Sequence, residues 1–359
     1  ALRPETLNNN KNNQQGLIMT RTVIGFLSMC VAVAAYAGVN SWTPVGPDGG
    51  GARSVAYHPT TPDLVFAVTD KSVYRSEDGG QSWTVALEDN SLDLGKIVVD
   101  PADSNRALVA GFGTLFRSSD AGASFSFELA PDIIGDLAIA PDGSVLYGIA
   151  NTSDPIIFLS TDFGETWQEQ AGTGLLAATF FSEFAIDPQD PNTIYIVYNN
   201  NGLFRSTDAG QNWTQQSAFT LIGTSQLAVD PADSTRLLLA TRDTGLLSSS
   251  DSGVTWTQEL TDGYVWVGHH PQAANGEAIA VSLDGAVVRR QGTGMAWETG
   301  QTLKLHSVFD GDFDPQNSDP FDSTLMIATE GGPLLTSDGG VSFSALGEGI
   351  RSATVTDIE

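Results

Sequence analysis

Polar and charged side chains recur at one position of a repeated sequence pattern. Counting back five residues from seven regularly placed prolines gives Ser54, Lys96, Asp136, Glu183, Gln226, Trp266 and Asp310. In most copies the residues two and four before the proline are large and apolar, as in Ile97 and Val99, and the residue three before it is small, as in Ala138. Such alternation indicates a strand buried on both faces. The seven residues five before the proline depart from this apolar pattern, and they predict a ring of mostly polar groups where these strands begin.

Further polar residues lie in turns that are expected to share this end of the strands. They are Asp70, Asn199, Asn200, Asn201, Arg242, Asp243 and Glu330. Acidic groups beside Tyr198, Tyr264 and Trp266 have the chemistry to bind a sugar, because carboxylates accept from hydroxyl groups and aromatic rings stack on apolar sugar faces. They equally suit a basic peptide. A hydrated rim without a specific ligand is a third interpretation, because polar residues are common at strand ends.

The elements that position these residues follow from a second motif, S-x-D-x-G-x-x-W. Its aspartates are Asp78, Asp120, Asp162, Asp208, Asp251 and Asp338, and a degenerate copy runs from Arg290 to Trp297 with Gly292 in place of the aspartate. The copies are about 43 residues apart, which is typical of one four-stranded propeller blade of roughly 40–45 residues. The Ser and Asp side chains can bond to turn backbone, the glycine allows positive φ, and the aromatic residue packs into the blade. We therefore expect an all-β propeller of about seven four-stranded blades, with structural box aspartates.

The motif resembles the Asp-box of sialidases, sortilin-type propellers, the photosystem II assembly factor propeller and the xyloglucanases, over about residues 42–359. Within it, Val68-Thr69-Asp70 resembles the start of xyloglucanases, whose Thr-Asp supplies one catalytic acid, so the resemblance implies that role for Asp70. Lys71 and Ser72 depart from the small residues of that family, and the family's partner acid belongs to a second propeller. The sialidase Arg-Ile-Pro signature is absent from the sequence.

Two functions compete on this basis. The main expectation is an exported, non-catalytic propeller that binds an extracellular or periplasmic protein or glycan at the mouth of the channel. Its expected ligand-binding residues are Lys96, Asp136, Glu183, Gln226, Trp266, Asp310, Arg242, Asp243 and Glu330. The alternative is a glycoside hydrolase, xyloglucanase-like or sialidase-like, that acts on extracellular polysaccharide and uses Asp70. This chemistry needs two carboxylates, so Asp70 alone favours binding over catalysis.

Charge and composition exclude several other classes. The formal net charge of -27 argues against nucleic-acid binding and against docking on anionic lipid. A single cysteine excludes a disulfide framework and a cysteine-based zinc site. The acidic stretch 309–322 is spaced like a calcium loop, but Pro315 and Phe321 stand where that loop needs glycine and glutamate. We expect a solvated acidic turn there, and no metal or cofactor.

The two ends of the chain carry separate expectations. Residues 19–37 show the basic, apolar and Ala-x-Ala regions of a signal peptide, so the protein is expected to be secreted or periplasmic, with residues 1–18 upstream of the true start. Residues 38–359 then form the propeller. Residues 42–45 and 354–359 resemble strands of one incomplete blade. The chain is therefore expected either to be part of a propeller of eight or more blades, or to close with seven.

Overall fold

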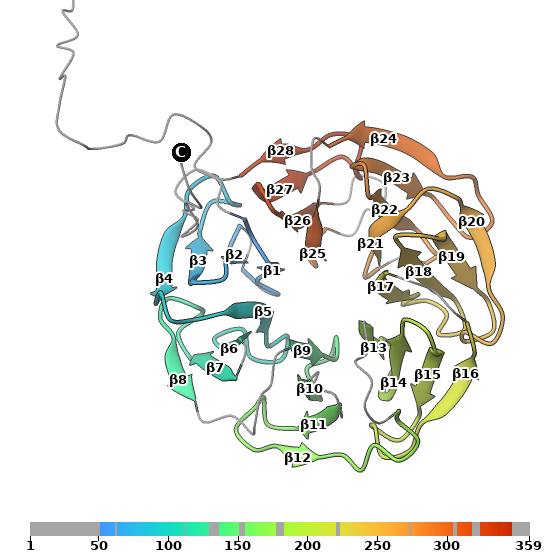
Figure 1. Ribbon diagram of the computed structural model, residues 1–359. Helices are drawn as coiled ribbons and strands as arrows, with labels where there is room; N and C mark the ends of the chain where they lie inside the picture. Colours follow the sequence, from blue (N-terminus) through green and yellow to red (C-terminus); the bar gives the residue numbers. More distant parts are fainter. Residues whose placement is uncertain are drawn as a thin grey trace, which may run out of the picture. The chain divides into compact units, whose positions relative to one another are not determined.

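The computed structural model describes residues 51–61, 63–111, 113–128, 136–150, 155–176, 183–219, 223–272, 274–303, 307–317 and 324–346. Over these ranges the chain forms 28 strands and no helix. The strands make seven antiparallel sheets of four strands each, in which sequence neighbours pair. The sheets are the blades of a seven-bladed propeller, and in Figure 1 the first strand of every blade lies closest to the centre of the ring.

The first four blades run from residue 54 to residue 217. Blade 1 comprises β1 (Ser54–Tyr57), β2 (Val65–Val68), β3 (Ser72–Ser76) and β4 (Thr84–Glu88). Blade 2 comprises β5 (Leu94–Val99), β6 (Ala107–Gly111), β7 (Thr114–Ser118) and β8 (Ser126–Glu128). Blade 3 comprises β9 (Asp136–Ile139), β10 (Leu146–Ala150), β11 (Ile156–Ser160) and β12 (Gln168–Glu169). Blade 4 comprises β13 (Glu183–Asp187), β14 (Asp190–Tyr198), β15 (Gly202–Ser206) and β16 (Thr214–Ser217).

The last three blades follow the same pattern. Blade 5 comprises β17 (Thr224–Val229), β18 (Leu237–Thr241), β19 (Gly245–Ser249) and β20 (Thr257–Leu260). Blade 6 comprises β21 (Tyr264–His269), β22 (Ala278–Ser282), β23 (Ala286–Arg290) and β24 (Glu298–Thr302). Blade 7 comprises β25 (Val308–Phe313), β26 (Leu325–Thr329), β27 (Gly332–Thr336) and β28 (Ser344–Ala345).

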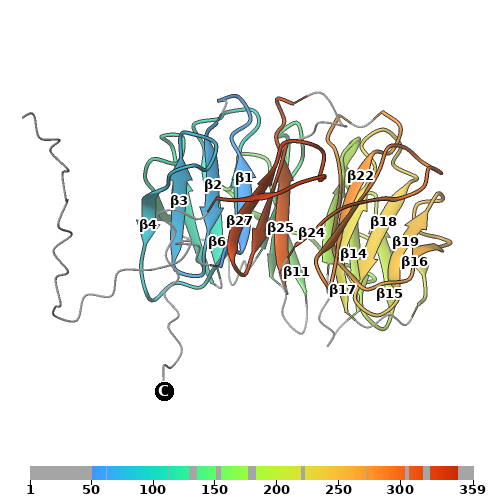
Figure 2. The same cartoon turned by 90° about the horizontal axis from the view of Figure 1, so that it is seen from above.

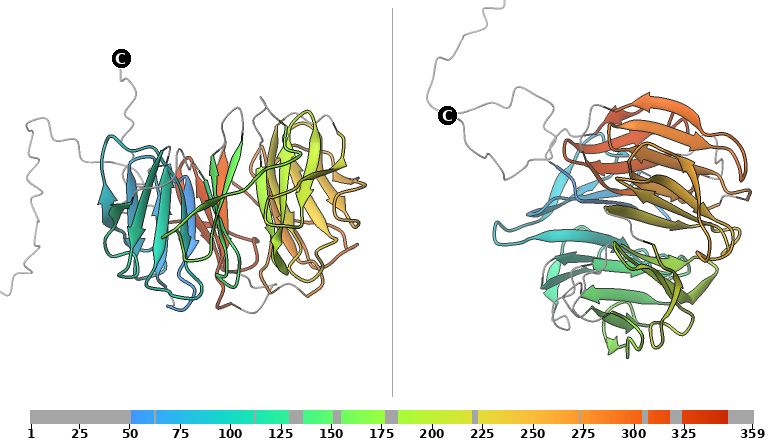
Figure 3. Two further views of the ribbon diagram at one scale, coloured as in Figure 1. Left: turned by 90° about the horizontal axis from the view of Figure 1, so that it is seen from below. Right: turned by 45° about the vertical axis from the view of Figure 1, so that its right-hand side comes forward.

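The core lies between the blades. Each of the seven hydrophobic clusters in the described residues joins two adjacent blades, and the second strand of a blade is buried almost throughout because neighbours cover both of its faces. The fourth strand lies at the outer rim and is largely exposed. The side views in Figure 2 and Figure 3 show the sheets standing upright beside one another.

Blades 7 and 1 pack directly on each other and so close the ring. The Ala52 amide donates to the Thr329 carbonyl at 2.8 Å, and the Trp83 indole donates to the Leu346 carbonyl at 2.6 Å. The seven blades expected from the repeats are therefore confirmed. The expected signal peptide and the strand-like segments at 42–45 and 354–359 lie outside the described residues.

The box motif closes the turn between the third and fourth strands. In blade 4, the Ser206 hydroxyl donates to Asp208 at 2.8 Å and accepts from the Gly210 amide at 2.9 Å, and Asp208 accepts from the Asn212 amide at 2.8 Å. Gly210 has a φ of 90°, which favours glycine. The same bonds recur at the other intact boxes. In the second box, hydrogen bonds from Ser124 lower the pKa of Asp120 to about 2.

Among the described residues, no helix is long and apolar enough to cross a membrane.

Candidate functional site

The innermost strands all begin at one face of the propeller, hereafter the channel-mouth face. Strand register fixes this geometry, because Ser54 pairs with Val68 and Lys96 pairs with Ala110. The start of each first strand therefore lies beside the end of the second strand. The turns that follow the second strands, including the turn with Asp70, reach the same face as the predicted polar ring.

Three members of that ring are in direct contact. Asp310 accepts a hydrogen bond from the Ser54 hydroxyl at 2.6 Å, and both of its carboxylate oxygens lie 2.8 Å from Lys96 Nζ. The Asp310 residue is 8% exposed, whereas the Lys96 side chain is 33% exposed. Blades 1, 2 and 7 are thus joined at the axis by a charged network.

Asp136 and Glu183 extend this network around the ring. Both belong to innermost strands, and both interact electrostatically with Lys96 and Asp310. Asp136 still contacts solvent, although protein surrounds it closely enough that burial raises the pKa of its carboxyl group, partly offset by Lys96. Burial also raises the pKa of Glu183, and the nearby Asp136 adds to the shift. The single lysine is therefore surrounded by more carboxyl groups than it can neutralise.

Asp312 is a further member that the sequence patterns did not predict. It occupies the position of Ala56 and Ala138 in the repeat, and its carboxylate accepts from the Tyr57 amide at 2.8 Å. Burial raises the pKa of Asp312 to about 7, with a smaller contribution from Asp310. The sequence signal that could have identified Asp312 was an acidic residue at a position where most other blades carry a small residue.

The expectation of a solvated acidic turn is wrong for the first part of that stretch. Residues 308–313 form the innermost strand β25, and Asp310 and Asp312 meet partners from blade 1. The alternation of acids thus reflects strand geometry, in which every second residue points the same way. No group of three or more metal-ligating side chains is found among the described residues.

The structure places the predicted aromatic residues in the core. Trp266 is 3% exposed and lies against Phe313, with ring centroids 6.1 Å apart. It also covers Gly311, where an added Cβ would lie 2.6 Å from the indole ring. Tyr198 and Tyr264 are likewise buried. These three rings offer no exposed face for stacking on a sugar, whereas Gln226 at the start of β17 is half-buried.

Several turns on the channel-mouth face contain a threonine whose hydroxyl group hydrogen-bonds to backbone atoms of the same turn. In blade 5 the Thr241 hydroxyl donates to the Gly245 carbonyl at 2.8 Å, next to Arg242 and Asp243. Thr69 and Thr329 make corresponding turn contacts in blades 1 and 7. Asp70 and Glu330 directly follow these two threonines, so they occupy equivalent positions on adjacent blades.

Asp70 lies in the turn between β2 and β3 rather than on an innermost strand. Its side chain is 25% exposed, and the carboxylate is 3.9 Å from Lys71 Nζ. Its backbone carbonyl accepts from the Leu94 amide at 2.9 Å, which anchors the turn to blade 2. A fixed backbone and a partly exposed carboxylate fit a group that meets a ligand from the channel-mouth face.

The fold and the box geometry together define an Asp-box β-propeller. The family model described as "Sortilin, neurotensin receptor 3" matches residues 156–284. The chain is 24% identical over 217 residues to the xyloglucanase Xgh74A of Acetivibrio thermocellus, covering 47% of this chain and 26% of that protein. Thus the chain spans about a quarter of the length of this relative.

Solved structures show the same fold. The GH74 xyloglucanase from Xanthomonas campestris superposes with a TM-score of 0.66 at 19% identity, covering 84% of this chain and 54% of that one. YCF48 from Cyanidioschyzon merolae gives a TM-score of 0.60 at 16% identity, covering 82% of this chain and 97% of that one. The resemblance to propellers of these groups is confirmed.

These matches correct the main functional expectation from the sequence. The interpretation as a non-catalytic binding propeller is wrong, because the curated relatives that match the chain are xyloglucanases. The glycoside hydrolase alternative agrees better with them. A single recognisable carboxylate, Asp70, is therefore not evidence against catalysis.

Proposed function

We propose that this propeller is part of a glycoside hydrolase that cleaves a xyloglucan-type polysaccharide, with Asp70 as one of its two catalytic carboxylates. The observation that carries the proposal is the similarity of about half of the chain to xyloglucanases. The signal-peptide-like segment 19–37 supports action outside the cytoplasm.

The position of Asp70 supports its role. A polysaccharide is too large to enter the packed blade interfaces, so a catalytic carboxylate must be reachable from a face. Asp70 is partly exposed on the channel-mouth face, and its turn is held by Thr69 and by the Leu94 amide. Such a fixed turn keeps the carboxylate in place, as catalysis requires.

The second carboxylate is proposed to come from another domain that faces Asp70. Glycoside hydrolysis uses two carboxyl groups about 5–9.5 Å apart on either side of the bond that is cleaved. Two axial acids already have partners within the propeller: Asp310 binds Ser54 and Lys96, and Asp312 binds the Tyr57 amide. The greater length of the xyloglucanase relatives leaves room for a second domain.

Hydrolysis assays on the full-length encoded protein test this proposal. We expect release of reducing sugar from xyloglucan, but none from a fluorogenic sialoside. Asp70→Asn should lower the turnover of xyloglucan by about a hundredfold or more, because loss of one acid–base group costs 10²–10⁴-fold. The matched control is Asp93→Asn, which removes an exposed carboxylate close to the Asp70 turn and should change turnover by less than about threefold.

Two results would contradict the proposal. One is absence of turnover on xyloglucan by the full-length, folded protein. The other is equal turnover in the Asp70→Asn and Asp93→Asn variants, which would remove Asp70 from the site even if the protein is a hydrolase.

A further inference from the structure

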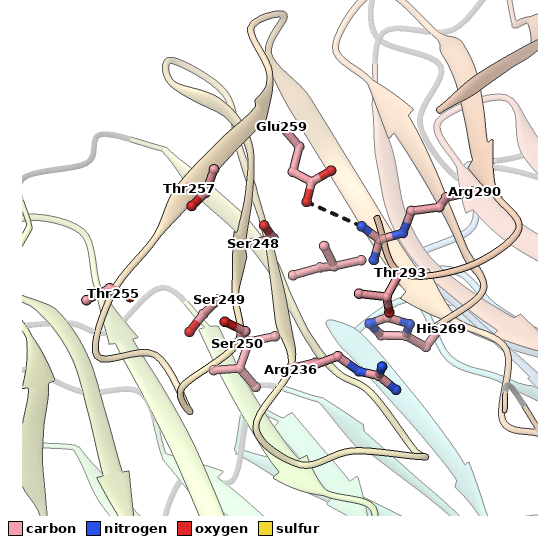
Figure 4. A pocket seen from close by; sticks show the side chains of 12 residues that line it. Arg236, Ser248, Ser249, Ser250, Thr255, Thr257, Glu259, His269, Arg290 and Thr293 are labelled. Atoms are coloured by element: carbon pink, nitrogen blue, oxygen red, sulfur yellow. Dashed lines mark hydrogen bonds and ion pairs between the residues drawn. The ribbon is translucent and has the colours of Figure 1, made fainter. Parts of the chain in front are cut away.

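A small polar cavity lies between blades 5 and 6, away from the channel-mouth face. Its volume is about 100 Å³, and Figure 4 shows it lined by hydroxyl-bearing side chains of blade 5 and by His269 and Arg290 of blade 6. The other charged groups at its wall are Arg236 and Glu259. None of these residues belongs to the proposed hydrolase site.

The cavity lies where the repeat departs from its own pattern. Arg290 and Gly292 stand where the neighbouring box has Ser249 and Asp251. His269 stands where blades 2 and 5 carry Val99 and Val229. These departures occur in one blade, and both replacement side chains, Arg290 and His269, line the cavity.

A third departure from the repeat pattern is a short side chain on the blade 5 side of the cavity. At the blade 1–2 boundary Arg75 donates to the Ala121 carbonyl at 3.0 Å, and at the blade 2–3 boundary Arg117 donates to the Phe163 carbonyl at 3.1 Å. The equivalent residue of blade 5 is Ser248, which is too short to bridge the boundary. An arginine–carbonyl contact is thus replaced by a cavity.

The cavity wall holds two side chains with a buried nitrogen atom that makes no hydrogen bond to the described residues. The Arg290 side chain is 5% exposed, its guanidinium lies 4.9 Å from the centre of the Trp297 ring, and its one ion pair, to Glu259, is 3.4 Å long. Its buried Nε has no hydrogen-bond partner among the described residues. His269 Nδ1 bonds to the Glu277 carbonyl at 3.1 Å, and no side chain or backbone group in the described part of the chain bonds to its buried Nε2. An oxygen-rich ligand would satisfy Arg290 Nε, and also His269 Nε2 once that nitrogen is protonated.

We propose that this cavity binds a small oxyanion of the phosphate, sulfate or carboxylate class. The cavity of about 100 Å³ has room for such an ion. The ligand oxygens accept from Arg290 and from the Ser248 hydroxyl, and the ligand occupies the space that an arginine side chain fills at the blade 1–2 and blade 2–3 boundaries. The proposal does not depend on the proposed hydrolase activity.

Charges around His269 predict that a proton binds together with the anion. Arg236 is already paired with Asp230 at 2.9 Å, and Arg290 faces Glu259. In the ligand-free cavity, burial lowers the pKa of His269 to about 4, with Asp230 opposing the shift and both arginines adding to it. A bound anion favours imidazolium, so its binding raises this pKa. Affinity should therefore increase as pH falls from 7.5 to 5.5.

Calorimetric titration of the full-length protein tests the site with phosphate, sulfate and acetate as probes, at constant ionic strength set with chloride. We expect saturable binding of at least one probe, and the ranking of the three separates tetrahedral anions from carboxylates. Arg290→Gln should weaken binding at least about tenfold, because a charge-assisted hydrogen bond contributes that much. The control Arg53→Gln removes an exposed arginine paired with Asp93 and should leave affinity unchanged.

Two further variants separate binding from folding. Ser248→Arg restores the residue type found at this position in blades 1 and 2, so it should fold while it fills the cavity and abolishes binding. His269→Val restores the residue type of blades 2 and 5 and should remove the pH dependence of affinity. Absence of saturable binding to the wild-type protein, or unchanged affinity in Arg290→Gln or Ser248→Arg, would overturn the proposal.

Discussion

Asp70 and the axial carboxylates lie at the same face of the propeller but in different electrostatic surroundings. Asp70 has one lysine at 3.9 Å and is a quarter exposed. Asp310 shares hydrogen bonds with Ser54 and Lys96 and is nearly buried, and Asp312 accepts a backbone amide from blade 1. The difference teaches that carboxylates at one face can have distinct roles: Asp310 and Asp312 join blades, whereas Asp70 lies partly exposed on a turn.

The largest loss of stability is expected at the centre of the axial group. Lys96→Met leaves Asp310 without its ammonium partner and removes a cation that interacts with Asp136 and Glu183. We expect a loss of about 2–3 kcal/mol in the free energy of unfolding at pH 7.5, at the low end for buried pairs because the lysine is a third exposed. Urea denaturation measures this loss.

The matched control is Lys71→Met beside Asp70. This ion pair is longer and lies at a turn, so its removal should cost less than about 1 kcal/mol. Equal losses in the two lysine variants would erase the distinction between the axial group and the Asp70 turn.

The pH dependence of stability sharpens the same distinction. The pKa of Asp312 is about 7 in the folded protein against an ordinary value of 3.8, so the folded state holds a proton that the unfolded chain releases as pH rises. This contribution is fully present below pH 3.8 and is lost as pH rises to about 7.

Asp312→Asn removes this dependence, because the amide oxygen still accepts from Tyr57 without ionising. We expect the variant to be more stable than wild type by up to about 4 kcal/mol at pH 8, because one pKa unit corresponds to about 1.4 kcal/mol, and nearly equal to it at pH 4. Thermal unfolding across this range measures the change. Asp314→Asn, just beyond the end of β25, is the control that should leave the pH dependence as it is.

The smallest effect is expected at Glu330, the blade 7 equivalent of Asp70. This side chain is exposed on the channel-mouth face, and we expect Glu330→Gln to raise the KM for xyloglucan by no more than about threefold without changing kcat. Steady-state kinetics measure both constants. A loss of kcat as large as that of Asp70→Asn would make the two turns functionally equivalent.

Much of the fold was predictable because each blade repeats the same chemistry. The boxes, the number of blades and the face shared by Lys96, Asp136 and Asp310 all follow from spacing. The contacts of Asp310 with Ser54 and Lys96 were not predictable, because they depend on how blades 7, 1 and 2 meet when the ring closes.

The errors have specific physical causes. Trp266 was expected to contact a ligand at the channel mouth. Because Gly311 has no side chain, the indole ring instead packs into the core between blades 6 and 7. Asp312 was missed because it lies in an acidic stretch for which the sequence predicts a solvated turn. The function was misjudged because the Asp-box stabilises a turn in any propeller and carries no information about the reaction.

The most direct test of the account is the turnover of xyloglucan by Asp70→Asn and Asp312→Asn, measured side by side at one pH in full-length protein. The account predicts a loss of about a hundredfold or more for Asp70→Asn with an unchanged melting temperature, and a turnover close to wild type for Asp312→Asn. Wild-type turnover in Asp70→Asn, or a loss confined to Asp312→Asn, would contradict it and move the chemistry to the axis.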